Sequence, residues 1–236
     1  MTTIVTGGTR GIGAAITRTL VADGHEVIAS YVRDDDSAEA LAGELDAVHV
    51  VRADVTTADG LETLFAAAER VGPVTGLVNN AGATLHVGPL AATDPEVIRS
   101  VIDLNLTAAV LCARRAVQAM TGGGTIVNIS SGAATLGSPG EYVHYAAAKA
   151  GVDALTLGLG KEVAALGIRV VGVAPGTIRT DIHADAGDPG RPDRVAERVP
   201  LGRAGEPDDI AGAVAWLFRP EAGYVTATTI RITGGL

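Results

Sequence analysis

The chain has little cysteine and no excess of basic charge. Cys112 is the single cysteine among 236 residues, so an internal disulfide framework and a cysteine-based zinc site are both excluded. It lies in an apolar helical stretch, which favours a buried, inert thiol. The 18 basic residues are outnumbered by 27 acidic ones, for a net charge of -9. Because phosphate contacts rely on lysine and arginine, this balance argues against a nucleic-acid partner.

Long apolar runs and metal-ligand spacings are also absent. Charged residues or glycines interrupt every apolar stretch well before it reaches the length of a membrane span, so we expect no membrane partner. The pair Ile4-Val5 already has the character of a strand, so we expect no signal peptide and a cytoplasmic location. The five histidines are scattered and none forms a ligand motif, so we expect no metal at the site.

Short β-branched runs alternate with helical patterns along the whole chain. The expected strands are Thr3–Thr6, Glu26–Tyr31, Val48–Arg52, Gly76–Asn79, Thr125–Ser130, Ile168–Ala174 and Thr228–Ile232. The expected helices are Gly11–Asp23, Ser37–Leu45, Ala58–Val71, Asp94–Met120, Tyr142–Leu166 and Pro207–Phe218. With 47% hydrophobic residues, this alternation predicts an α/β fold. We expect one domain over residues 1–236, a doubly wound parallel sheet of about seven strands with helices on both faces.

Residue types at the ends of these elements support the assignment. Gly24 and Gly167 follow the ends of two expected helices, and Asp94 stands before Pro95 as a capping residue. The one long irregular stretch, Pro175 to Gly205, is rich in proline and glycine. Such a loop is usually functional, so we expect a substrate lid at about 177–205. A surface insertion without a role is the alternative.

A glycine-rich turn from Thr6 to Gly13 follows the first strand and opens the first helix. Glycines allow the chain to turn sharply and to bring backbone N–H groups close to an anion at the helix N-terminus. The spacing is Thr-Gly-x-x-x-Gly-x-Gly rather than the more common Gly-x-Gly-x-x-Gly. This turn predicts a dinucleotide phosphate site formed by Gly7, Thr9, Arg10, Gly11, Ile12 and Gly13.

Tyr145 and Lys149 lie four residues apart at the start of an alanine-rich helical stretch. One helical turn places both side chains on the same face. A free tyrosine has a pKa of about 10, and a neighbouring ammonium favours the phenolate. We therefore expect Lys149 to lower the pKa of Tyr145 and to make it an acid–base catalyst.

These motifs, in this order, resemble the short-chain dehydrogenase/reductase family over essentially the whole chain. The similarity is greatest to members that resemble bacterial 3-oxoacyl-acyl-carrier-protein reductases and sugar dehydrogenases. Further segments that carry the resemblance are Asp54-Val55, Asn79–Gly82, Asn105, Ser130-Ser131, Pro175-Gly176 with Thr180, Leu201–Pro207 and Thr233–Gly235.

The resemblance implies hydride transfer between a nicotinamide and a small-molecule carbonyl or secondary alcohol. Tyr145 would be the acid in reduction and the base in oxidation, and Lys149 would also contact the nicotinamide ribose. Ser131 would donate a hydrogen bond to the substrate oxygen, and Asn105 would shape a water-linked proton relay. The alternatives are a turn-forming serine, a helix-kink asparagine and a solvated lysine.

The resemblance also implies which other residues bind the coenzyme. Asp54 would accept from the adenine amino group, Asn80 would pack near the adenosine ribose, and Ile178 with Thr180 would hold the carboxamide. The same regions contribute Val55, Ala81, Gly82, Pro175 and Gly176.

The serine–tyrosine spacing departs from the family pattern. Ser131 and Tyr145 are fourteen positions apart, one more than the family usually has, and Ser130 is farther still. Tyr142 is excluded as the acid because Ala146 takes the position of the required lysine; it is expected to line the substrate pocket.

The second expected strand indicates which coenzyme is preferred. Its tip carries no acidic residue, whereas Arg33 and Arg10 can both reach a 2′-phosphate, which favours NADP over NAD. Asp34, Asp35 and Asp36 follow directly, so a shift of register leaves NAD open. Their other role is to lead into the next helix, with Asp36 or Ser37 as its cap.

Two other functions share this fold. A catalytically silent NADP(H)-sensing binding protein is the main alternative, although such a chain is expected to lose the tyrosine or the lysine first. An epimerase or dehydratase normally needs a longer substrate domain. The resemblance further implies a homo-oligomer, a tetramer formed through the fourth and fifth helices and the C-terminal strand. The small residues Ala146, Ala147, Ala148, Ala150 and Gly151 would allow close helix contact there, or serve packing on the sheet. Substrate identity is not readable from the sequence.

Overall fold

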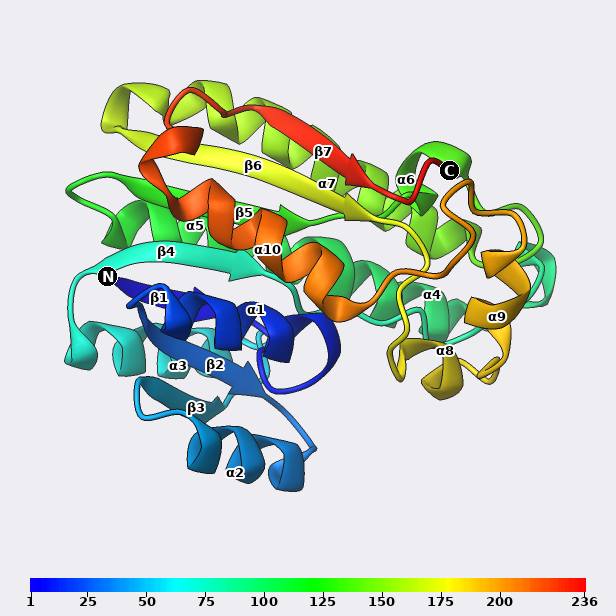
Figure 1. Cartoon of the computed structure of the whole chain (residues 1–236), viewed down its shortest axis with the longest axis horizontal. Helices are drawn as coiled ribbons and strands as arrows, with labels where there is room; N and C mark the ends of the chain where they lie inside the picture. Colours follow the sequence, from blue (N-terminus) through cyan, green and yellow to red (C-terminus); the bar gives the residue numbers. More distant parts are fainter.

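Seven parallel strands form one sheet in the computed structural model, which describes residues 1–236 (Figure 1). The strand order is β3-β2-β1-β4-β5-β6-β7. Strands β2 and β3 therefore lie on one side of β1, and β4 to β7 lie on the other. Ile4 of β1, for example, pairs with Ile28 on one side and with Leu77 on the other. The strands are β1 (Thr2–Val5), β2 (Glu26–Tyr31), β3 (Val48–Arg52), β4 (Val74–Asn79), β5 (Gly124–Ile129), β6 (Ile168–Pro175) and β7 (Thr228–Ile232).

Alternate residues of the strands face two separate apolar cores. Val127 and Ile129 of β5 belong to one core, whereas Ile126 belongs to the other. The first core contains residues of α1 (Gly11–Ala22), α2 (Asp35–Glu44) and α10 (Pro207–Phe218). The second contains residues of α3 (Ala58–Val71) and α5 (Ala108–Ala119), together with Val163, which directly follows α7 (Val143–Glu162). The predicted doubly wound sheet with helices on both faces is confirmed.

The long helix predicted over residues 94–120 is interrupted. Asp94 caps α4 (Pro95–Ile102) as predicted, but a π-helical turn, η2 (Asp103–Thr107), separates α4 from α5. Asn105 lies in this turn, and its Nδ2 donates to Val101 O at 2.9 Å and to Ala83 O at 2.8 Å. Because the side chain binds a carbonyl one turn earlier, it competes with the regular helical hydrogen bond and favours the wider turn.

Two further helix boundaries differ from the prediction. Helix α2 begins at Asp35, because the Asp34 side chain accepts from Ser37 N at 2.9 Å; neither Asp36 nor Ser37 is the cap. Helix α7 ends at Glu162, and a 3₁₀ turn, η3 (Ala164–Leu166), follows it. Gly167 then takes a left-handed conformation with φ 72°, as a residue after a helix end often does.

The sequence predicts an irregular stretch from Pro175 to Gly205, but residues 177–205 are in part helical. They contain two short helices, α8 (Ile182–Asp185) and α9 (Arg191–Ala196), which lie beyond the arrowheads of the strands in Figure 1. The remaining short elements are η1 (Leu90–Ala92), α6 (Ala133–Leu136) and η4 (Pro220–Ala222). None of the helices has the length and apolar character needed to cross a bilayer.

Candidate functional site

A cleft of about 1510 Å³ runs along the carboxyl ends of the strands. Residues that follow β1 to β6 line it, together with side chains from residues 177–205. This is the edge where parallel sheets bind ligands, next to the point where the strand order reverses. Every residue predicted to bind the coenzyme lines this cleft, as do Ser131, Tyr145 and Lys149. Asn105 alone among the predicted site residues does not.

The glycine-rich turn has a shape that larger residues would destroy. Gly7 and Gly11 have φ values of 61° and 52°, in the left-handed region. A Cβ atom on Gly13 would collide with the carbonyl oxygen of Gly7, so only glycine fits there. Across the cleft, the Thr180 methyl group lies 3.2 Å from the position of a Cβ on Gly11. No side chain caps the N-terminus of α1, and its first residues line the cleft, so their N–H groups are free to bind an anion there.

Thr6 and Asn80 hold the turn against the end of β4. Thr6 Oγ1 accepts from the backbone N of Asn80 at 2.9 Å and of Ala81 at 3.0 Å. Asn80 Nδ2 in turn donates to the carbonyl oxygens of Thr6 and Gly7, both at 3.0 Å. Asn80 therefore fixes the glycine-rich turn, and the ribose contact that the family resemblance implies stays a prediction.

The wall of the cleft at the end of β2 includes one polar residue that the sequence analysis missed. Ser30, at the end of β2, accepts from Gly7 N at 3.2 Å through its Oγ and lines the cleft. Its place before the strand tip, beside the glycine-rich turn, was the available signal. Asp54 lines the same region, and its Oδ1 accepts from Thr56 N at 3.0 Å.

Arg33 is the unpaired cation near the tip of β2. Arg33 lines the cleft and forms no hydrogen bond or ion pair within the chain. Asp34 is occupied as the cap of α2, and hydrogen bonds from Ser37 lower the pKa of its carboxyl. Asp35 lies 3.6 Å from Arg52. Arg10, the other candidate, pairs with Asp185 of α8 at 2.9 Å; both of these side chains are about half exposed.

Tyr145 and Lys149 are both buried on α7, against the end of β5. Lys149 Nζ donates to Ile129 O at 2.8 Å and lies 5.6 Å from the centroid of the Tyr145 ring. Ser130 Oγ donates to Lys149 O at 3.3 Å, which holds the helix against the strand. Ser131 follows directly, so the strand end and the helix bring its hydroxyl and the phenol into one cleft.

The predicted lowering of the Tyr145 pKa is wrong for this structure. Burial raises the pKa of Tyr145 to about 12, and the nearby Ser131 hydroxyl opposes this only in part. Burial also lowers the pKa of Lys149 to about 8, opposed by Asp153. The ammonium is directed at a backbone carbonyl and lies over the face of the ring, so desolvation outweighs the expected effect of its charge.

Asn105 lies behind the cleft, next to Gly82. Its Oδ1 is buried and has no hydrogen-bond partner within the chain. A Cβ on Gly82 would lie 2.6 Å from Asn105 Oδ1 and 3.4 Å from Lys149 Nζ, so the glycine keeps open the space between the two groups. An unpaired buried acceptor close to an ammonium is a place that a bridging water suits, and the proton relay through Asn105 stays a prediction.

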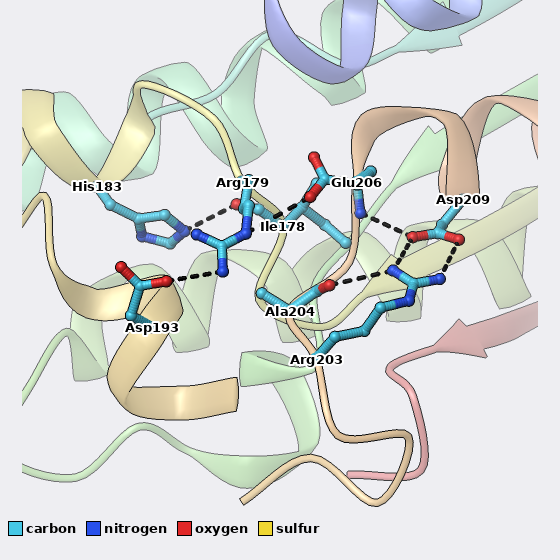
Figure 2. Close-up of polar contacts among 8 residues, drawn as sticks. All are labelled: Ile178, Arg179, His183, Asp193, Arg203, Ala204, Glu206 and Asp209. Carbon is cyan, nitrogen blue, oxygen red and sulfur yellow. Dashed lines mark hydrogen bonds and ion pairs between the residues drawn. The ribbon is translucent and has the colours of Figure 1, made fainter. Parts of the chain in front are cut away.

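The two ends of residues 177–205 are bonded to each other at the base of the segment, where Figure 2 shows the contacts of the Arg179 side chain. Gly205 N donates to Thr177 O at 2.9 Å, and Arg179 N donates to Gly205 O at 2.9 Å. The Arg179 side chain reaches Asp193 at 2.7 Å and Glu206 at 3.5 Å. Beyond this base, the segment contributes His183 and Arg191 to the cleft, two residues that the sequence analysis did not select. No group of three or more metal-ligating side chains occurs.

Comparisons with known proteins agree with this geometry. A family model described as enoyl-(acyl carrier protein) reductase matches residues 7–236. The oxidoreductase YgfF of Escherichia coli K12 is 40% identical, over 98% of both chains. A 3-oxoacyl-[acyl-carrier-protein] reductase of Synechocystis is 36% identical, over 99% of this chain and 95% of its own.

The fold comparison gives the same result. A crystal structure of a dehydrogenase/reductase from Sinorhizobium meliloti 1021 superposes with a TM-score of 0.92 at 36% identity, covering 99% of this chain and 94% of the other. The fold, the family model and the relatives agree over nearly the whole length. The chain therefore belongs to the short-chain dehydrogenase/reductase family of oxidoreductases.

Proposed function

We propose that the protein is an NADP-dependent oxidoreductase that interconverts a carbonyl compound and a secondary alcohol. The observation that carries this proposal is the meeting of Ser131, Tyr145 and Lys149 in one cleft with a phosphate-binding glycine turn. The bound coenzyme would supply the hydride for reduction and accept it in oxidation.

The shape and charge of the cleft suit such a coenzyme. The turn from Gly7 to Gly13 and the N-terminus of α1 would hold the pyrophosphate. Asp54 and Asn80 would lie along the adenosine, and Ile178 with Thr180 at the nicotinamide end. Arg33 would bind the 2′-phosphate, because it lines the cleft and carries a charge that no carboxylate of the chain neutralises.

The chain's own residues would manage the proton. Tyr145 would donate it to the carbonyl oxygen, while the Ser131 hydroxyl would hold that oxygen by a hydrogen bond. Because burial keeps the pKa of Tyr145 high, the phenol would be protonated at neutral pH, as reduction requires. Lys149 and the unpaired Asn105 Oδ1 would return a proton to the phenolate through water.

The substrate class is tested with a panel of ketones, aldehydes, sugars and acyl thioesters, each with NADPH and NADH. One relative is named a 3-oxoacyl-[acyl-carrier-protein] reductase, so 3-oxoacyl thioesters are the first class to try. We expect turnover, followed at the nicotinamide absorbance, with NADPH preferred. Tight coenzyme binding without turnover of any compound would instead identify a nucleotide-sensing protein.

We further propose that the protein assembles as a homotetramer through α5, α7 and β7. Val110 and Leu111 on α5 and Leu157 on α7 are large apolar residues left exposed by the single chain. Of the small residues predicted at this contact, Ala146 and Ala148 are buried within their own chain and are not available for it. Light scattering at micromolar concentration should give four times the chain mass, and a monomer mass would reject the proposal.

A further inference from the structure

Arg191 joins the 177–205 segment to the end of the cleft where Tyr145 lies. It begins α9, yet its side chain is only 12% exposed. Nη1 donates to Thr177 Oγ1 at 3.1 Å, and Nη2 donates to Glu141 Oε2 at 2.8 Å. Nε is buried without an acceptor. One guanidinium therefore contacts both the start of the segment and the residue that precedes Tyr142.

The same guanidinium lies over a tyrosine ring that supports Tyr145. Arg191 Cζ is 5.1 Å from the centroid of the Tyr142 ring. Tyr142 packs edge to face against Tyr145, with centroids 5.5 Å apart and planes at 89°. Both geometries are favourable for cation–π and aromatic contacts. The chain of contacts from α9 to the phenol of Tyr145 is thus continuous.

The charged and titratable groups that face Tyr145 are few. Lys149 comes from its own helix, Tyr142 from the residue that directly precedes that helix, and Arg191 from α9; the neutral hydroxyl of Ser131 faces it as well. The positive charge of Arg191 lowers the pKa of Tyr145 and of Tyr142, against the larger effect of burial.

We propose that Arg191 is a positioning residue that holds Tyr145 in its reactive place through Tyr142, and so couples catalysis to closure of residues 177–205. This inference rests on the proposed oxidoreductase function. On this proposal residues 177–205 do not only cover the cleft, because they also supply the Arg191 cation that orders Tyr142 and Tyr145. The closed segment and the ordered phenol are then one state of the protein.

A neighbouring ion pair supplies a control that distinguishes positioning of Tyr145 from simple attachment of residues 177–205 to the protein. Asp193, two positions along α9, bonds to Arg179 at 2.7 Å, but these side chains are 73% and 44% exposed. Neither lines the cleft. Asp193→Asn therefore loosens the same helix without touching Tyr142, and it is the matched control for Arg191→Met.

The experiment compares wild type, Arg191→Met, Arg191→Lys and Asp193→Asn with the best carbonyl substrate and NADPH. We expect Arg191→Met to lose between about tenfold and a hundredfold in kcat, with KM changed by less than about threefold, because a small displacement of an acid is costly. Arg191→Lys should recover part of the loss, since it keeps the charge. Asp193→Asn should keep the wild-type kcat.

Two readouts exclude a purely structural effect. Hydrogen exchange of the protein alone should rise in residues 177–205 for both Arg191→Met and Asp193→Asn, although only the former loses kcat. In a Tyr142→Leu background, Arg191→Met should cause little additional loss, because the contact through which it acts is already gone. Circular dichroism melts confirm that each variant is folded.

The inference is overturned if Arg191→Met keeps the wild-type kcat, if it changes only KM, or if Asp193→Asn loses as much as Arg191→Met. It is also overturned if the losses in the Tyr142→Leu background are additive. These results differ from failure of the proposed function, in which wild type itself turns over no carbonyl compound. In that case both proposals fall.

Discussion

Replacing the buried ammonium of Lys149 should stabilise the protein while it destroys activity. Lys149 is 3% exposed, and burial lowers its pKa from 10.5 to about 8. A shift of this size corresponds to about 3 kcal/mol of folding free energy lost at neutral pH. Methionine fills a similar volume without charge, but it leaves Ile129 O without its donor, which costs about 1 kcal/mol. We expect Lys149→Met to be more stable than wild type by about 2 kcal/mol at pH 7.

The stability difference between Lys149→Met and wild type should depend on pH, because the pKa of Lys149 differs between the folded and the unfolded protein. Below pH 8 the lysine is protonated in both the folded and the unfolded protein, so wild type bears the whole cost. Between pH 8 and 10.5 the folded protein loses this proton before the unfolded chain does, so wild type gains stability relative to the variant. The advantage of Lys149→Met should therefore be largest at pH 7 and mostly gone by pH 10. Tyr145 and Cys112 titrate in both proteins, so their contributions cancel in the difference.

The assay is urea unfolding at pH 7 and pH 10, followed by circular dichroism and by the fluorescence of the single tryptophan, Trp216. Turnover is measured on the same samples. A Lys149→Met variant that is less stable than wild type at pH 7 would refute the reasoning. An advantage of the same size at both pH values would refute it too.

Three further predictions follow from the site. Ultraviolet titration of the protein alone should give the same phenolate signal below pH 10 for wild type and Tyr145→Phe, because burial raises the pKa of Tyr145 to about 12; a missing phenolate near pH 8 in the variant would contradict this. Arg33→Gln should raise the KM for NADPH about tenfold and leave that for NADH nearly unchanged, with Arg52→Gln as the unaffected neighbour; equal effects on both coenzymes would reject Arg33 as the phosphate ligand. In denaturant unfolding, Gly13→Ala should lower the free energy of unfolding by about 2 kcal/mol or more. Gly43→Ala is the control: Gly43 has open space around it, so the change should raise that free energy by about 0.5 kcal/mol. A Gly13→Ala variant at least as stable as Gly43→Ala would mean that the turn can relax.

The sheet and its two cores could be predicted because they depend on local patterns. Strands such as β5 alternate between residues of the two cores, and their runs of β-branched residues are bounded by glycine or by polar residues. The glycine-rich turn could be located because backbone geometry at Gly7 and Gly13 allows few other residues. Proximity of Tyr145 and Lys149 followed from helical spacing alone.

What could not be predicted depends on contacts between distant segments. The π-helical turn at Asn105 arises from hydrogen bonds to both Val101 and Ala83, and the second of these is set by the loop after β4. The pKa of Tyr145 depends on how deeply the phenol is buried, which helical spacing does not determine. Arg191 lies in a segment with no clear periodicity, so nothing in the sequence pointed to its contact with Tyr142.

The most direct test of the account is the Tyr145→Phe variant, which removes one hydroxyl and keeps the ring that packs against Tyr142. We predict that the rate of carbonyl reduction falls by a factor of about 10² to 10⁴, while the dissociation constant for NADPH stays within about threefold of wild type. A Tyr145→Phe variant that reduces the same substrate at the wild-type rate would show that the proton comes from another group.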